Sequence, residues 1–250
     1  GNNEFLSEGL YITSKAVDSL DQIEGISPSD ITSSLKEITS GATSALDQIE
    51  VSDYSASSLG EMVQEISSGA TQALGNIEID GISSDNLSSM MEKVTAGATG
   101  ALGRISMEGY SSSNLTTMLS KITSGATSAL GDIEMEGYSS GNLGLMVEKI
   151  TAGATSALDK IQLKGFSSDN LSSMVQEITS GATGALDEIE MAGFDPSTDV
   201  FSMTEKVVLG TTGALSEIEM DGYDSDDLEG MIEGVTTGAM SAINELQSAG

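Results

Sequence analysis

A Gly-Ala-Thr triplet recurs through the chain at a spacing of 28 residues. Its glycines are Gly41, Gly69, Gly97, Gly125, Gly153 and Gly181. Degenerate copies follow at Gly210 and Gly238, and an irregular first copy has Lys15 in the glycine position. The 250-residue sequence is thus an array of nine copies of one unit. So short a unit cannot bury an apolar face alone, so neighbouring units must stack to form a continuous core.

Within a unit, the apolar residues follow a helical period. In the copy around Gly181 they are Leu171, Met174, Val175, Ile178, Ala182, Ala185, Leu186 and Ile189. At about 100° per residue they fall in one stripe roughly 120° wide. The pattern predicts one helix of about 23 residues per repeat, some 35 Å long. The expected fold is all-α, either an α-solenoid or an elongated antiparallel multi-helix stack.

The two prolines of the chain mark where these helices begin. Pro28 and Pro196 occupy the same place in the repeat and directly follow Ser27 and Asp195. Proline is favoured at the first helical position, where its missing N–H costs nothing. Ser27 and Asp195 are therefore predicted N-caps, and Ser167 is the equivalent cap in the copy around Gly181.

Glycine in the middle of each predicted helix needs an explanation, because it costs roughly 0.5–1 kcal/mol relative to alanine. Close approach of neighbouring helices at their midpoints is the favoured reason. A break there, giving a short helical hairpin per repeat, is the alternative. A leucine-rich repeat or a parallel β-helix is the rival architecture at this length, but the L-x-x-L-x-L signature is missing.

The array is expected to be a single domain with atypical ends. Residues 1–25 form an irregular N-terminal unit and residues 26–220 the regular repeats. Residues 221–250 begin with a run of acidic side chains, as in a polar unit that caps a solenoid.

A formal net charge of −30 limits the partners that this surface can take. It opposes binding to nucleic acids and to anionic membranes, both of which need clustered Lys and Arg. It suits basic or cation-bridged protein partners, including a second copy, or simple solubility. No stretch of 18 apolar residues predicts a transmembrane helix.

The sequence lacks two residue types that many catalytic sites use. It has no histidine and no cysteine, so Ser-His-Asp and Cys-His chemistry and His-based zinc sites are absent. Gly137–Gly141 matches G-x-S-x-G, but the same turn loses the match one repeat later. We therefore expect that the protein is not an enzyme and that it binds no cofactor, with the exception of calcium. Carboxylates at Asp224, Asp226 and Asp227 are the candidate calcium ligands, although the EF-hand spacing is missing.

Methionines form a column at one helical position, and they are either core filling or the lining of an adaptable apolar groove. They are Met62, Met90, Met118, Met146, Met174, Met203 and Met231.

The leading hypothesis is a non-catalytic acidic scaffold with an extended binding surface. The first alternative is a structural subunit of a filament or surface layer assembled through divalent cations. The second is a carrier of an apolar ligand. A start at Gly1, few Lys and Arg, and much Ser, Thr and Gly favour a secreted or cell-surface protein.

Overall fold

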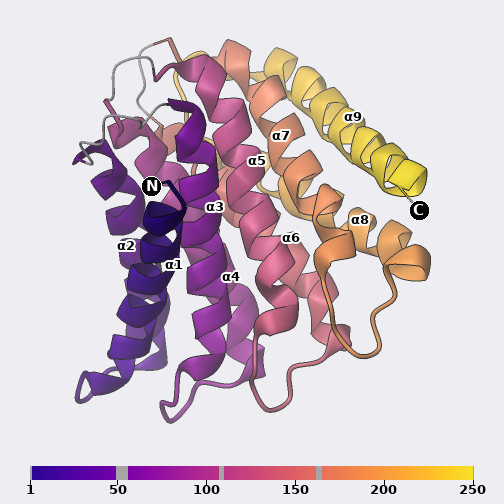
Figure 1. The fold of residues 1–250 in the computed structure, drawn as a ribbon. Coiled ribbons are helices and arrows are strands. Elements are labelled where there is room, and N and C mark those ends of the chain that lie inside the picture. Colours follow the sequence, from indigo (N-terminus) through magenta and orange to yellow (C-terminus); the bar gives the residue numbers. More distant parts are fainter. Residues whose placement is uncertain (1, 49–55, 107–109, 162–164, 250) are drawn as a thin grey trace.

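The computed structural model describes residues 2–48, 56–106, 110–161 and 165–249. Within these ranges the chain forms nine α-helices and no strand (Figure 1), which confirms the all-α class. The helices are α1 (Asn2–Asp18), α2 (Pro28–Ala45), α3 (Ala56–Ala73), α4 (Leu87–Ala101), α5 (Ser112–Ser128), α6 (Leu143–Ser156), α7 (Leu171–Gly184), α8 (Pro196–Gly213) and α9 (Ser225–Ala249).

Each repeat is one helical rod rather than a hairpin. In the copy around Gly181, a 3₁₀ turn at Ser168–Asn170 leads into α7, and a second at Leu186–Glu188 follows it. The rods are about 21 residues long, close to the predicted 23. The predicted helix is slightly too long because Ile189 already has extended backbone angles. Its side chain stays buried and so still belongs to the apolar stripe.

The predicted N-caps are confirmed. Ser27 and Asp30 exchange hydrogen bonds in a capping box, with Pro28 at the first helical position. In the copy around Gly181, the Ser167 N–H donates to Oδ1 of Asn170 at 2.9 Å. Asp195 accepts from the Ser197 N–H at 3.0 Å. These bonds satisfy backbone groups that every helix start leaves without a partner.

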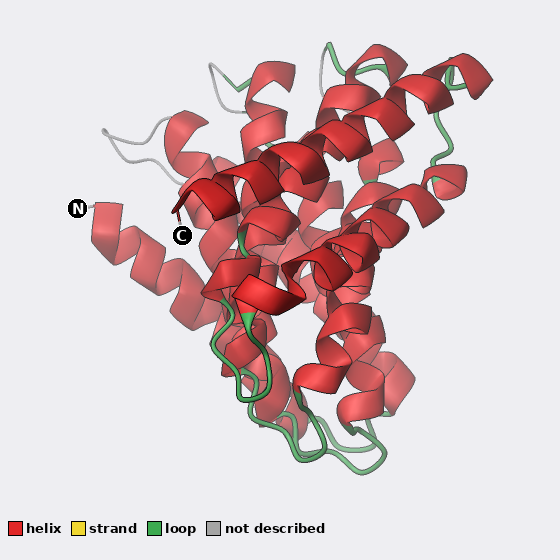
Figure 2. Cartoon of the chain, turned by 90° about the vertical axis from the view of Figure 1, so that its right-hand side faces the viewer, coloured by secondary structure: helices red, strands yellow, loops and turns green. Residues whose placement is uncertain are grey.

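The helices form two layers, because each packs mainly against the helix two places along the chain. The odd layer contains α1, α3, α5, α7 and α9, and the even layer contains α2, α4, α6 and α8. Consecutive helices run in opposite directions, and the loops that follow the odd helices α1, α3, α5 and α7 lie together at one edge (Figures 1 and 2). Helices within a layer are therefore parallel.

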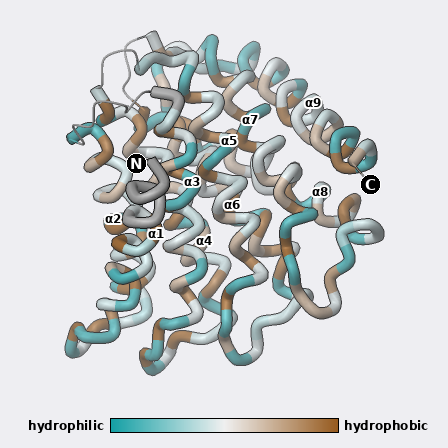
Figure 3. Tube along the Cα trace, in the orientation of Figure 1, coloured by the Kyte–Doolittle hydropathy of each residue, from teal (hydrophilic) through white to brown (hydrophobic). Residues whose placement is uncertain are grey.

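Two apolar clusters fill the space between the layers. One takes the N-terminal halves of even helices and the C-terminal halves of odd helices, and the other takes the opposite halves. Thus α6 contributes Leu143 and Ile150 to the first cluster and Ala154 to the second, which Ile161, after the following 3₁₀ turn, also joins. Brown and teal segments accordingly alternate along the helices in Figure 3. The methionine column lies in these clusters, which confirms its role as core.

The triplet glycines lie where helices of one layer come closest. A Cβ on Gly153 of α6 would collide with the Glu92 carbonyl oxygen and the Thr95 hydroxyl of α4. At five more of these positions, an added Cβ would likewise collide with a backbone carbonyl oxygen of the preceding helix in the same layer. They are Gly97, Gly125, Gly181, Gly210 and Gly238. The inference of close midpoint approach is therefore correct, and the helices that approach are two repeats apart.

Buried threonines occupy the same level and differ in their bonding. The Thr151 hydroxyl lies 3.1 Å from the Val207 carbonyl oxygen of α8 and equally close to the Glu148 carbonyl oxygen of its own helix, so its one proton is shared between α6 and the neighbouring helix of the layer. Four residues on, the buried hydroxyl of Thr155 has no protein partner. The same pairing of bonded and unbonded threonine recurs at Thr95 with Thr99 and at Thr123 with Thr127.

Replacing each of these threonines by valine is expected to give opposite results. Thr151→Val removes a buried hydroxyl that has acceptors on both α6 and α8, and it should lower the free energy of unfolding by about 0.5–1.5 kcal/mol. Thr155→Val removes a buried hydroxyl without a partner, so it should be neutral or stabilise by up to about 1 kcal/mol. Urea denaturation of both variants makes the comparison. An equal loss in Thr155→Val would mean that its hydroxyl has a partner such as bound water.

Candidate binding surfaces

Two of the three aspartates predicted as calcium ligands, Asp224 and Asp227, accept hydrogen bonds that cap α9. The Asp226 N–H donates to Oδ1 of Asp224 at 2.9 Å, and the Asp224 N–H donates to Oδ2 of Asp227 at 3.0 Å. Asp224 therefore begins α9 in the manner of Ser27 in α2. Within the described ranges, no group of three or more acidic side chains is arranged to hold a metal ion.

Basic side chains are distributed unequally between the layers. One repeat position has lysine on α4, α6 and α8 (Lys93, Lys149 and Lys206) and glutamate on α3 and α7 (Glu65 and Glu177). The exceptions at this position are Glu37 on α2 and Lys121 on α5. Arg104 and Lys160 repeat the pattern just beyond α4 and α6. With Lys36, the even helices and their final turns hold six of the nine basic residues.

Four of these cations line one groove on the even layer, with a volume of ≈ 530 Å³. Lys36 comes from α2, Lys93 from α4, Arg104 from the turn after α4, and Lys160 from the turn after α6. The remaining lining residues include the carboxylates Glu37 and Glu92 and the small residues Ser40, Ala96, Gly97, Gly100, Gly103, Ser156 and Ala157. The groove therefore has two more positive than negative side chains, in a chain with an excess of 30 negative charges.

The ion pairs near the groove leave most of its cations available. Glu92 pairs at 3.4 Å with Lys149, which is not a lining residue. Arg104 donates a hydrogen bond to the Ser44 hydroxyl at 3.2 Å. In the described part of the chain, Lys36, Lys93 and Lys160 have no carboxylate within ion-pair distance.

Sequence reasoning missed this groove because no contiguous motif marks it. Its cations lie on three helices that are two repeats apart along the chain. The available signal was a charge period of 56 residues from Arg104 to Lys160, with Asp132 at the same position in the repeat between them. The position of Lys93 gives no such signal, because Lys121 shares it on the opposite layer.

The odd layer carries crowded carboxylates with few cations. Lys121 is the single basic residue of α3, α5, α7 and α9. Desolvation by burial, and then the charge of Glu61, raises the pKa of Glu65. Desolvation and then Glu245 raise the pKa of Glu177. Desolvation and then Asp187 raise the pKa of Glu188, and the charge of Lys121 offsets part of this rise. Each of these carboxylates would gain from a nearby positive charge.

Acidification below neutral pH is therefore expected to stabilise the fold. A carboxylate whose pKa is higher in the folded state binds a proton more readily there, so stability rises as pH falls toward its ordinary value of 4.5. Thermal melting between pH 7 and pH 5 measures the effect. Glu177→Gln should reduce this pH dependence, and a midpoint that falls steadily over the range would contradict the expectation.

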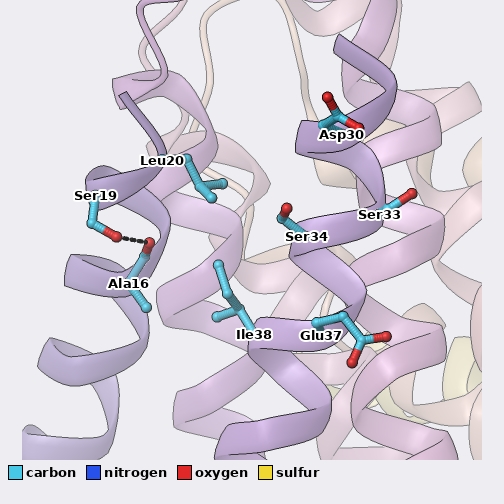
Figure 4. A pocket seen from close by; sticks show the side chains of 8 residues that line it. All are labelled: Ala16, Ser19, Leu20, Asp30, Ser33, Ser34, Glu37 and Ile38. Atoms are coloured by element: carbon cyan, nitrogen blue, oxygen red, sulfur yellow. Dashed lines mark hydrogen bonds between the residues drawn. The ribbon is translucent and has the colours of Figure 1, made fainter. Parts of the chain in front are cut away.

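A second hollow, of ≈ 470 Å³, lies between α1 and α2 at the N-terminal end of the array. Figure 4 shows Leu20 on the 3₁₀ turn after α1, and Ser34 and Ile38 on α2, around it. Ser34 occupies the repeat position at which the later helices have methionine. The hollow is thus the place where the stacking of helices stops.

Comparisons with known proteins add little to these observations. No family model and no curated protein matches the chain. A solved structure described as "Computational Design of Self-Assembling Cyclic Protein Homooligomers" aligns with 99% of this chain and 98% of its own. Its identity is 12% and its TM-score is 0.40, a likeness too distant to support any statement about function. None of the helices in the described ranges is both long and apolar enough to span a bilayer.

Proposed function

We propose that the protein is a non-catalytic scaffold that offers the acidic outer face of its odd layer to a basic partner. The observation that carries the proposal is the crowding of carboxylates across α3, α7 and α9. Lys121 is the single basic residue of α3, α5, α7 and α9. A basic partner would relieve this repulsion, and complementary charge both speeds association and selects the partner.

The composition supports the rest of the proposal. Without histidine or cysteine, the chain lacks the usual general bases and thiol nucleophiles. Its acidic clusters recur with the repeat, as expected of a surface property and not of a single reaction centre. We also propose that the protein acts outside the cell or on its surface, because Lys and Arg are few and Ser, Thr and Gly are abundant.

A short oligolysine peptide is the probe for the acidic face. Calorimetric titration should show binding that weakens as salt rises. Glu65→Gln with Glu177→Gln should weaken it several-fold. The matched control is Glu148→Gln with Glu205→Gln, which removes the same charge from the even layer and should change binding less than about twofold. Equal loss in both double variants would mean that only net charge matters, and would overturn the proposal.

Assembly end to end through divalent cations is a second candidate, and one observation favours it. Ile12 on α1 is 63% exposed, and Ile23 in the turn after α1 is 50% exposed. Ile77, which has the same repeat position as Ile23, is only 5% exposed. Leu228 and Ile232 are similarly uncovered on α9. Apolar side chains that are buried between helices inside the array are thus exposed to solvent at both ends of it.

Light-scattering mass after size exclusion distinguishes the two candidates. In EDTA and in millimolar calcium, a scaffold should keep its mass of 25.6 kDa. A large rise in mass with calcium, reversed by EDTA, would favour assembly instead, with carboxylates bridged between chains.

A further inference from the structure

We propose that the groove on the even layer binds a compact multivalent oxyanion of the phosphate class. The site is separate from the acidic face of the odd layer. It consists of Lys36, Lys93, Arg104 and Lys160 around the small side chains of α4 and α6.

The arrangement of the cations is the first argument. They come from α2, α4 and α6 and line one groove, instead of forming a row along one helix. Cations in the last turn of a helix are common because they offset the helix dipole, and this accounts for Arg104 and Lys160. It does not account for Lys36 and Lys93, which lie within α2 and α4.

The charge balance within the groove is the second argument. One of its two carboxylates, Glu92, is already paired with Lys149 outside the lining. Charges beyond roughly 8–10 Å are largely screened at physiological salt, so the local cations outweigh the distant excess of acid. A multivalent anion gains from all four cations at once, whereas a single carboxylate gains from one or two.

The shape of the groove is the third argument. Its volume of ≈ 530 Å³ lies within the usual range of ligand sites. Helix packing does not require glycine at position 100, where a Cβ would make only ordinary contact with the Lys160 stem at 3.6 Å. The same repeat position in α3 is Gln72, so the array accommodates a long side chain there. Glycine at this position keeps the groove open between Lys93 and Lys160.

Calorimetric titration of the full chain with pyrophosphate, in EDTA to exclude metal complexes, tests the inference. We expect saturable binding at one site, stronger than binding of inorganic phosphate or acetate. Lys93→Gln with Lys160→Gln should weaken it by about tenfold or more. Gly100→Gln should weaken it comparably by filling the groove without changing its charge.

Lys121→Gln is the matched control, because it removes a lysine from the repeat position of Lys93 on the opposite layer. It should leave pyrophosphate binding within about twofold. Circular dichroism of each variant confirms that the fold is kept. No binding at millimolar pyrophosphate, or equal weakening in the control and the groove variants, would overturn the inference. Neither result would affect oligolysine binding to the odd layer, so the two proposals fail independently.

Discussion

Gly153→Ala is expected to lower the free energy of unfolding by about 1–3 kcal/mol, although alanine is the better helix former. The added methyl group would overlap the Glu92 carbonyl oxygen of α4, which is backbone and cannot rotate away. To accept it, α4 and α6 would have to separate and lose the packing on either side of the contact.

Gly41→Ala is the matched control and should have the opposite sign. Gly41 has the same repeat position in α2, but no helix precedes α2 in its layer and a Cβ there would meet nothing within 4 Å. The substitution should stabilise the fold by about 0.5–1 kcal/mol, since only the gain in helix propensity remains. Chemical denaturation measures both. Similar changes in the two variants would show that close helix contact is not the reason for the repeated glycine.

Leu143→Ala in α6 is expected to cost about 2–5 kcal/mol, because this side chain is completely buried and the rigid array cannot collapse around the cavity. Leu228 has the same repeat position in α9, yet it is 37% exposed because no later helix covers it. Leu228→Ala should therefore cost less than about 1 kcal/mol.

The comparison between these leucines measures how much of the stability comes from the neighbouring helix. Equilibrium unfolding monitored by circular dichroism gives both values under the same conditions. If Leu228→Ala costs as much as Leu143→Ala, then α9 is covered in solution, and an oligomer would be the first explanation to examine by light scattering.

The features that could be predicted from sequence are local ones. The eight apolar residues from Leu171 to Ile189 predict the rod, because helical period needs no knowledge of neighbours. Pro28 and Pro196 locate the helix starts for the same reason. Gly181 even predicts a long-range contact, because the loss of helix stability caused by glycine has no local explanation.

The partner of each helix could not be predicted in the same way. The apolar stripe of one helix, such as α7, packs against helices of both layers. The width of the stripe does not show that the main contact is with the helix two repeats away. The acidic run at Asp224, Asp226 and Asp227 is ambiguous for a related reason. Helix capping and cation binding use the same oxygen atoms, and only the backbone geometry shows that the Asp224 and Asp227 carboxylates bond to N–H groups.

Because each helix packs mainly against the second helix along the chain, this packing sets the smallest number of repeats that can form a stable fold. Two consecutive repeats share only their weaker contact, so a two-repeat fragment lacks the main interface altogether. Three repeats are needed before one such interface exists, and closing it spans 56 residues instead of 28. Folding must therefore cross a larger entropic barrier than in an array whose adjacent helices pair. In the folded array, loss of one helix exposes the packing surface of a helix two repeats away. Unfolding should therefore spread across several repeats, and single repeats should not fray one at a time from the ends.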